Sequence, residues 1–271
     1  MLQKAFAFLA ALTLVTLAGC GGGGTNTPPN TTTPTKTEGT APKAEKKKPT
    51  GGAKEAYAAD KHKGSIKGVV LFEGEAARPK INTSGDAKCH AMHEKEPLVS
   101  EEFVVKDGKL ANVIVHIKGG NDKFSYETPS TPVTVDQKGC QYVPHVFALM
   151  VDQPLVFVNS DPLLHNVHGK GKANPEFNIS QAQAGQKDTK KLPEPELPYN
   201  VGCDVHKWMS AKAGVFDHPF FAVTGADGSF EIKGVPAGDY EVEAWHESMP
   251  AQTIKVSVKE DAAEAKFTFK K

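Results

Sequence analysis

The sequence predicts an all-β protein, and three observations support this prediction. Apolar and polar residues alternate in several short runs, for example in residues 110–117, as is typical of strands with one buried face. Asp227-Gly228 stands between two such runs and is a strong signal for a hairpin turn. No stretch shows the period of a long helix. The residues from 64 onward suffice for two small domains.

The first twenty residues predict export. Lys4 precedes an apolar run, residues 5–17, which is too short to span a membrane and is typical of a secretory signal. The ending at residues 17–20, Leu-Ala-Gly-Cys, resembles a bacterial lipobox. This resemblance implies that Cys20 becomes an acylated N-terminus, which anchors the protein to a membrane of the bacterial cell envelope, on its periplasmic or outer-membrane face. The alternative is an ordinary signal followed by a coincidental cysteine.

Residues 21–63 predict a disordered tether. The segment is rich in Thr, Pro, Gly and Lys and shows no apolar periodicity, so it cannot bury a core. Over the whole chain 32 basic residues balance 32 acidic ones, which indicates neither nucleic acid nor a strongly charged partner.

Strand patterns follow the tether on both sides of a central region. Before this region they include residues 65–74 and 110–117. After it they begin with a hairpin in residues 221–232 and continue in residues 235–245, 254–258 and 265–269.

The central region contains a spaced set of metal-binding residues. Cys203, His206 and Met209 are each separated by two residues, so one tight loop can turn all three inward. His165 follows a strand-like run, residues 154–159, that ends in a turn-rich Asn-Ser-Asp-Pro sequence. Two imidazoles, one thiolate and a weak axial thioether are the ligands of a blue-copper electron-transfer centre. The sequence therefore predicts one type 1 copper site.

Other interpretations of these residues remain. A Cys-x-x-His spacing also occurs in zinc sites, Cys203 alone is compatible with a structural cysteine, and Met209 alone with a core side chain. The combination with His165 and the strand-rich flanks favours copper. His168 lies three residues further on and is expected to face the opposite side of the strand, as a histidine at the rim.

Both segments together resemble a cupredoxin. Cys203-x-x-His206-x-x-Met209 is similar to the short ligand loop of amicyanin and plastocyanin-like members, and His165-Asn-Val to the segment that carries the first ligand. The resemblance covers roughly residues 130–218. It implies that Asn166 ties the two ligand segments together behind the metal ligands. It also implies that His206 carries electrons to the surface. Trp208 lies between two of the ligands: facing solvent, it would offer an apolar contact to a redox partner, and facing inward it would shield the metal; we expect the exposed role.

The flanking strands resemble a different sandwich. Residues 224–230, Thr-Gly-Ala-Asp-Gly-Ser-Phe, and residues 236–240, Pro-Ala-Gly-Asp-Tyr, are similar to the recurring phrases of transthyretin-like, carboxypeptidase-regulatory domains. The strands that normally open such a domain stand before the copper region. We therefore expect one β-sandwich from residues 64–125 plus 219–271, interrupted by a Greek-key cupredoxin sandwich in residues 126–218. Two sequential sandwiches or one fused β-structure are the alternatives.

Two cysteines remain after Cys20 and Cys203 are assigned. Because an exported protein meets an oxidising compartment, Cys89 and Cys140 are expected to form a disulfide. The alternative is a second metal site built from these cysteines and nearby histidines, namely His90, His93 and His145. A hydrogen-bonded structural role is expected for His145, and His246 is expected at a half-buried strand end.

The sequence thus predicts a lipid-anchored carrier of single electrons between redox partner proteins, and no enzyme. Copper storage or delivery, and a structural or carbohydrate-binding envelope lipoprotein, are the alternatives. Copper nitrite reduction requires a second copper, whereas one ligand set is visible. The sequence shows no Ser/His/Asp order, phosphate-binding Gly loop or haem attachment sequence.

Overall fold

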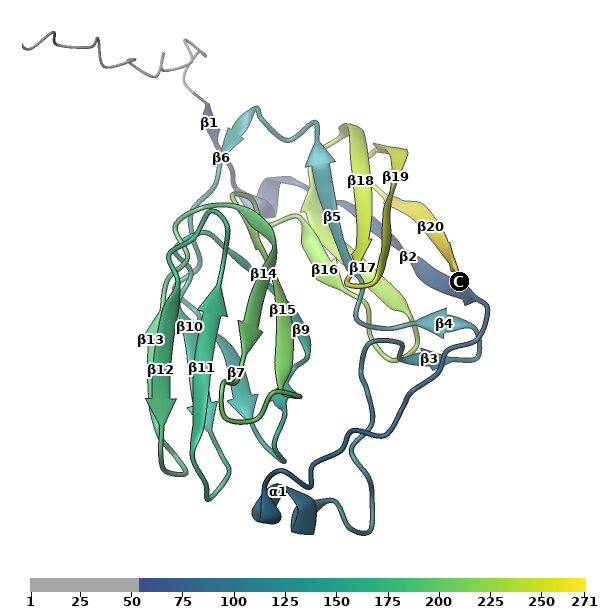
Figure 1. The fold of residues 1–271 in the computed structure, drawn as a ribbon. Coiled ribbons are helices and arrows are strands. Elements are labelled where there is room, and N and C mark those ends of the chain that lie inside the picture. The colour runs from purple at the N-terminus through teal and green to yellow at the C-terminus, as the bar shows by residue number, and fades with distance from the viewer. Residues whose placement is uncertain (1–53) are drawn as a thin grey trace, which may run out of the picture. The chain divides into compact units, whose positions relative to one another are not determined.

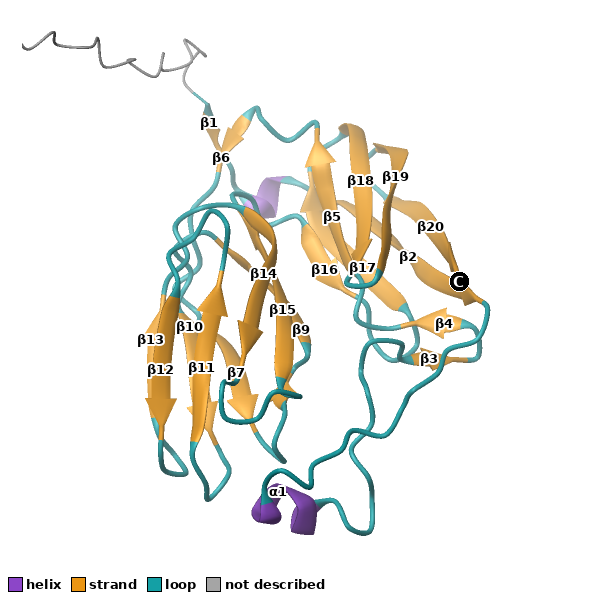
Figure 2. Cartoon of the chain, in the orientation of Figure 1, coloured by secondary structure: helices purple, strands orange, loops and turns teal. Residues whose placement is uncertain are grey.

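A computed structural model describes residues 54–271, and it is nearly all β, as the sequence predicts (Figures 1 and 2). All described residues lie in one structural unit. The expected signal peptide, Cys20 and most of the expected tether lie outside the described residues. Neither of the two helices among the described residues is long and apolar enough to cross a membrane.

One pair of sheets is built from the two ends of the described chain, and we call it the flanking sandwich (residues 64–125 and 219–271). In its first sheet β2 pairs with β17, β4 and β20, and in its second β5 pairs with β16 and β18. Its strands are β2 (Gly64–Glu73), β3 (Val105–Lys106), β4 (Lys109–Leu110), β5 (Ile114–Gly119), β16 (Phe221–Val223), β17 (Ser229–Val235), β18 (Gly238–His246), β19 (Met249–Val258) and β20 (Ala262–Lys270).

The second pair of sheets, which we call the inserted sandwich, lies entirely within residues 126–218. One sheet has the order β13-β10-β7-β8 and the other β12-β11-β14-β15-β9. The strands are β7 (Val133–Gln137), β8 (Tyr142–Val143), β9 (Val146–Met150), β10 (Leu155–Asn159), β11 (His165–Lys170), β12 (Phe177–Gln181), β13 (Lys187–Lys190), β14 (Glu196–Gly202) and β15 (Ser210–Phe216).

Regular structure begins before residue 64, within the range expected to be a tether. Strand β1 (Glu55–Ala56) pairs in parallel with β6 (Phe124–Ser125), and a 3-10 helix, η1, follows at Ala59–Lys61. The hydroxyl of Tyr57 donates to the carbonyl of Gly234 at 2.6 Å, and its ring packs edge-on against Phe220. Tyr57 thus binds this segment to the flanking sandwich through both its hydroxyl and its ring. The polar residues around it led to the prediction of a tether.

Each sandwich has its own core. In the flanking sandwich the core is formed by aliphatic and aromatic side chains such as Ile66, Val242 and Phe267. In the inserted sandwich it includes Phe157 and Tyr199 and also Cys203 and Met209. A small cluster of Ile114, Val146 and Phe216 contains residues of both. The expected ligand residues thus lie in the interior of the inserted sandwich.

The only α-helix among the described residues is short and interrupts the flanking sandwich. Helix α1 (Ala87–Met92) lies in the long connection between β2 and β3 (Figure 2). Asp86 is its N-cap and accepts hydrogen bonds from the backbone N–H groups of Lys88 and Cys89, as N-cap carboxylates do. Six residues are too few to show a helical period, which is why the sequence pattern did not reveal this element.

Candidate metal centre

His165 is the first residue of β11 and is completely buried. Its Nδ1 atom lies 2.9 Å from Nδ1 of His206. Its other ring nitrogen, Nε2, lies 2.9 Å from Oδ2 of Asp161. One imidazole nitrogen therefore points to a neighbouring imidazole, and the other is held by a carboxylate.

The other three expected ligands lie in the connection from β14 to β15. The loop is closed by backbone hydrogen bonds from the N–H of Cys203 to the carbonyl of Met209 at 3.2 Å, and from the N–H of Met209 to the carbonyl of His206 at 2.9 Å. The N–H of His206 lies 3.3 Å from Sγ of Cys203. All three residues are buried, with at most 4 % of their surface exposed. The two-residue spacings therefore form a tight turn that directs its side chains inward.

The donor atoms of His165, Cys203 and His206 all lie within 4.8 Å of one another. Sγ of Cys203 is 3.9 Å from Nδ1 of His206. A metal ion holds such ligands at about 2.0–2.3 Å, so one ion can bind all three atoms with small adjustments. The set of two imidazoles and one thiol fits copper, and the buried Met209 adds a soft thioether to the same core.

Asn166 joins the two ligand segments. Its Oδ1 atom accepts hydrogen bonds from Sγ of Cys203 at 3.2 Å and from the N–H of Asp204 at 2.6 Å. The hydroxyl of Tyr142 lies 2.6 Å from the carbonyl of Asn166 and 3.0 Å from that of Gly202, and so bridges the same two strands. These bonds fix the thiol and His165 in one frame.

Hydrogen bonds and neighbouring charges shift the pKa values of the thiol and of His165 in opposite directions. Burial raises the pKa of Cys203, but hydrogen bonds from His165 and from backbone N–H groups outweigh burial and leave this pKa below its usual value. Burial lowers the pKa of His165, but Asp161 and Cys203 outweigh it and raise this pKa to about 9. A cation binding between these groups therefore replaces a proton, as metal binding to His and Cys generally does.

Two carboxylates behind the histidines were missed by the sequence analysis. Asp161 accepts hydrogen bonds from the N–H groups of Gly139 and Cys140 at 2.7 and 2.8 Å, in addition to facing His165. Asp86 places its Oδ2 atom 3.5 Å from Nε2 of His206, an atom that makes no hydrogen bond. Asp161 could have been found from its position in the turn four residues before His165, whereas Asp86 is remote in sequence and carries no such signal.

Two expectations about the surface of the site are wrong. His206 was expected to reach the surface, but only 2 % of it is exposed and its Nε2 atom is covered. Trp208 was expected to face solvent, but it is half-buried and packs against the ring of His206 with centroids 5.1 Å apart, while its Nε1 donates to the carbonyl of Cys140 at 3.1 Å. Both side chains are covered because the segment around Asp86 lies against this side of the ligand loop, with Oδ2 of Asp86 3.5 Å from Nε2 of His206.

Cys89 and Cys140 form a disulfide. Their sulfur atoms are therefore not available as thiolates to the second metal site weighed above. The three histidines of that alternative do not point to one site. His90 is exposed on α1, and Nε2 of His93 lies 2.8 Å from the carbonyl of Gly139. His145 bonds to the carboxylate of Glu247 and the carbonyl of Ser210. His168 bridges Asp204 and Glu176 at the rim, and His246 bonds to the carbonyl of Glu102.

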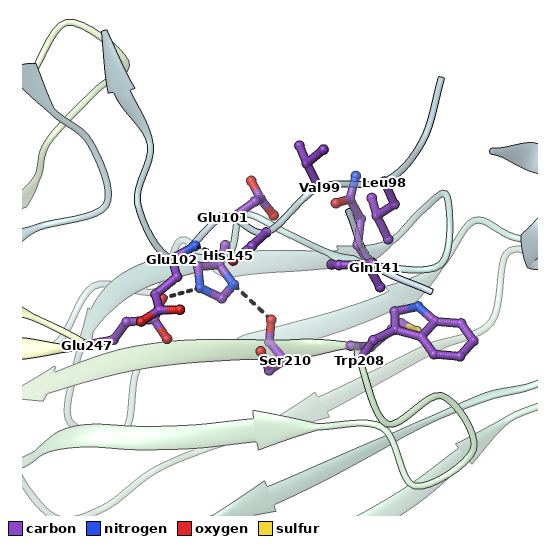
Figure 3. A pocket seen from close by; sticks show the side chains of 12 residues that line it. Leu98, Val99, Glu101, Glu102, Gln141, His145, Trp208, Ser210 and Glu247 are labelled. Carbon is purple, nitrogen blue, oxygen red and sulfur yellow. Dashed lines mark hydrogen bonds and ion pairs between the residues drawn. The ribbon is translucent and has the colours of Figure 1, made fainter. Parts of the chain in front are cut away.

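A cavity of about 150 Å³ adjoins the site on the side of Trp208 and Met209 (Figure 3). In Figure 3 His145 lies between Glu247 and Ser210, with Trp208 at the far end. The distance from Nε2 of His145 to Oε1 of Glu247 is 2.5 Å. This bond connects the inserted sandwich to β18–β19 of the flanking sandwich.

Comparisons with known proteins give likenesses in fold over about a third of the chain. No protein-family model matches the sequence, and no curated protein matches it. Among solved structures, a mutant of amicyanin in the Cu(I) form has 20% identity and a TM-score of 0.29, and covers 33% of this chain and 86% of its own. A purple cupredoxin from Nitrosopumilus maritimus has 17% identity and a TM-score of 0.27, and covers 30% of this chain and 97% of its own.

A copper-containing nitrite reductase from Thermus scotoductus SA-01 has 22% identity and a TM-score of 0.30. The match covers 37% of this chain but only 25% of the reductase chain. These structural neighbours are cupredoxins or contain copper, and the likenesses are too weak to carry an argument about this chain. A metal site is therefore indicated by the side chains described above and not by these likenesses.

Proposed function

We propose that this protein is a type 1 copper protein that carries single electrons between redox partner proteins in the bacterial cell envelope. The observation that carries the proposal is the convergence of Nδ1 of His165, Nδ1 of His206 and Sγ of Cys203 inside the inserted sandwich. The ligands would be His165, Cys203, His206 and Met209, of which the thioether would be the weakest.

Copper bound there supplies one-electron chemistry between Cu(I) and Cu(II). The chain's own residues keep the geometry constant between the two states. Asp161 holds the orientation of His165, and Asn166 ties the thiolate loop to β11. Burial of all four ligands excludes water from the site. Such a rigid, closed set suits electron transfer because little rearrangement accompanies a change of charge.

The remaining parts of the proposal come from the sequence. Acylation at Cys20 would anchor the chain to a membrane, and residues 21–53 would act as a tether. The flanking sandwich, with its transthyretin-like phrases, would serve as scaffold for the inserted one. We infer no nucleic-acid partner and no catalytic role. Membrane fractionation of the full chain beside a Cys20→Ser variant tests the anchor, since the variant is expected in the soluble fraction.

The decisive test is an optical spectrum and metal analysis of the full chain expressed in the periplasm. The copper-loaded protein is expected to show an intense thiolate-to-copper visible band and narrow copper hyperfine splitting in electron spin resonance. Cys203→Ser is expected to abolish the band. His168→Gln, which removes a histidine at the rim, is the matched control and should retain it.

Protein that binds copper without colour would contradict the type 1 centre. A coloured protein that passes its copper rapidly to an acceptor chelator would favour copper delivery over electron transfer. A parent protein that binds no copper at all would leave a pair of β-sandwiches with a structural role.

A further inference from the structure

The long connection between β2 and β3 closes on itself before it reaches the inserted sandwich. The N–H of Ile81 donates to the carbonyl of Leu98 at 2.8 Å, and the N–H of Ser100 to the carbonyl of Pro79 at 2.9 Å. Helix α1 lies between these two legs. We call residues 79–100 the cap. Because two backbone hydrogen bonds join its ends, the cap is an ordered segment.

The cap is fixed to the inserted sandwich on the side of the metal ligands. The disulfide joins Cys89 of α1 to Cys140. Nε2 of His93 lies 2.8 Å from the carbonyl of Gly139, and Gly85 lies beside the ring of Trp208. One covalent bond and one hydrogen bond therefore connect two segments that are distant in sequence.

Each half of the disulfide is bonded to a carboxylate that faces a ligand histidine. The N–H of Cys140 donates to Oδ2 of Asp161 at 2.8 Å, and the same oxygen lies 2.9 Å from Nε2 of His165. On the other side, the N–H of Cys89 donates to Oδ1 of Asp86 at 2.9 Å, and Oδ2 of this residue lies 3.5 Å from Nε2 of His206.

The sulfur atoms themselves are also close to both imidazoles. Ligand atoms of Cys140, Asp161 and His165 lie within 4.8 Å of one another, and so do those of Cys89, Asp86 and His206. Because both sulfurs are in the disulfide, neither group is a separate metal site. Instead, the disulfide lies directly behind the two histidines.

Partners behind a ligand orient it and control the access of solvent, and their loss commonly changes metal affinity by about 10–100-fold. His206 lies in the loop between β14 and β15, yet its Nε2 atom is buried. We propose, on the basis of the metal centre proposed above, that the cap, held by the disulfide, positions and shields one of the ligands of that centre. It positions His206 through Asp86 and closes this ligand against solvent.

The first arm of the test uses the metal-free full chain and hydrogen–deuterium exchange. In the Cys89→Ser/Cys140→Ser double variant the cap is expected to open. Exchange should then accelerate in residues 81–92 and also at the backbone amides of residues 203–209, which are not covalently attached to the cap. Strands β18 and β19 of the flanking sandwich should exchange as in the parent, and Lys95→Ala, an exposed change in the cap, should match the parent throughout.

The second arm separates the two contacts of Asp86. Asp86→Ser removes the carboxylate but retains an efficient N-cap residue for helix α1. Asp86→Ala removes both the carboxylate and the N-cap hydrogen bonds of this helix. Asp86→Ser should leave exchange in α1 unchanged. In the copper-loaded protein both variants should change the nitrogen and copper hyperfine pattern and accelerate copper removal by a chelator by about tenfold or more.

Unchanged exchange in residues 203–209 of the double variant, together with unchanged hyperfine pattern and chelation rate in Asp86→Ser, would overturn the proposal. If the double variant fails to fold, the Asp86 variants decide alone. A protein that shows no blue band but shows the expected exchange in its metal-free form would refute the type 1 centre while supporting the cap, so the two failures are distinguishable.

Discussion

The two sandwiches bury different kinds of side chain. The flanking sandwich has an aliphatic and aromatic core, with Phe230, Phe267 and Phe269 among its members, and buries fewer polar side chains beside it, among them His116, Thr224 and His246. The inserted sandwich, of similar strand composition, buries a series of polar and titratable groups next to its apolar core. They are Gln137, Asn159, Asp161, His165, Asn166, Gln181 and His206.

The partners of these buried polar groups show how the inserted sandwich accommodates them. Burial of a polar group is unfavourable unless it is hydrogen-bonded or binds an ion. Most polar groups in the inserted sandwich bond to one another, as Gln137 does to Gln181. Three potential ligand atoms, of His165, Cys203 and His206, also lie within 4.8 Å of one another, which is the arrangement expected of a metal site. Among the described residues, each such group includes a residue of the inserted sandwich, and the connection between β2 and β3 contributes Asp86 and Cys89 to one of them.

The largest expected effect tests whether the two cores are independent. Phe267→Ala removes a side chain that is 1 % exposed in the flanking core. It should lower the free energy of unfolding by about 4 kcal/mol, because it removes buried apolar surface and leaves a cavity. Denaturant unfolding followed by fluorescence and by the visible copper band measures both parts. A visible band that disappears at low denaturant together with the flanking core would show that the sandwiches unfold as one unit.

The second prediction concerns the ion pair that joins the sandwiches. Burial lowers the pKa of His145, but Glu247 outweighs this and leaves the pKa above its ordinary value of 6.5. The pKa of Glu247 is lowered, with burial opposing and His145 favouring the charged form. The pair therefore contributes fully to the stability of the fold between about pH 4.5 and 6.5. This contribution is lost as the pH rises through the pKa of His145 in the folded protein, and it is lost in acid as the pH falls through the lowered pKa of Glu247.

Glu247→Gln should therefore lower the free energy of unfolding by about 2 kcal/mol near pH 6, and by less at alkaline pH, because it removes the charged hydrogen-bond partner that keeps His145 protonated. Thermal unfolding of parent and variant from about pH 5 to 10 measures the difference. Lys118→Ala is the matched control, because it breaks an ion pair at an exposed lysine and should cost much less than Glu247→Gln. A constant difference between Glu247→Gln and parent over the whole pH range would contradict this account.

The smallest expected effect sharpens the assignment of the inserted core to metal binding. Asp161→Asn keeps the size of the side chain but removes the charge that faces His165. Copper affinity should fall by about 10–100-fold, the range found when a carboxylate behind a ligand histidine is lost. Competition with a chelator of known affinity measures this change. Asp188→Asn, which alters a carboxylate bonded to Gln181 in the same sandwich, should retain the affinity of the parent.

The sequence predicted those features that depend on residue type and local spacing. The all-β fold follows from alternation and turn residues, and the turn of Cys203, His206 and Met209 follows from their spacing. Asn166 was expected beside the ligands, and the structure places its amide oxygen against the thiol. In each case the signal lies within a few residues of the feature.

What the sequence did not reveal depends on contacts between distant segments. Helix α1 is too short for a periodic signal and is stabilised by its N-cap and by the disulfide. Asp86 reaches His206 only because the cap closes over the inserted sandwich, so no local pattern predicts the contact. For the same reason the exposure expected for His206 and Trp208 was wrong: the covering residues come from the other half of the chain.

The pairing of β2 with β20 has a consequence for biosynthesis. Ser65 lies opposite Ala262, so the first long strand of the flanking sandwich meets this neighbour only when translation is nearly finished. All strand partners of residues 126–218 belong to the same stretch, and such nearer pairings form faster than remote ones. We therefore expect the inserted sandwich to complete its strand pairings before β2 pairs with β20.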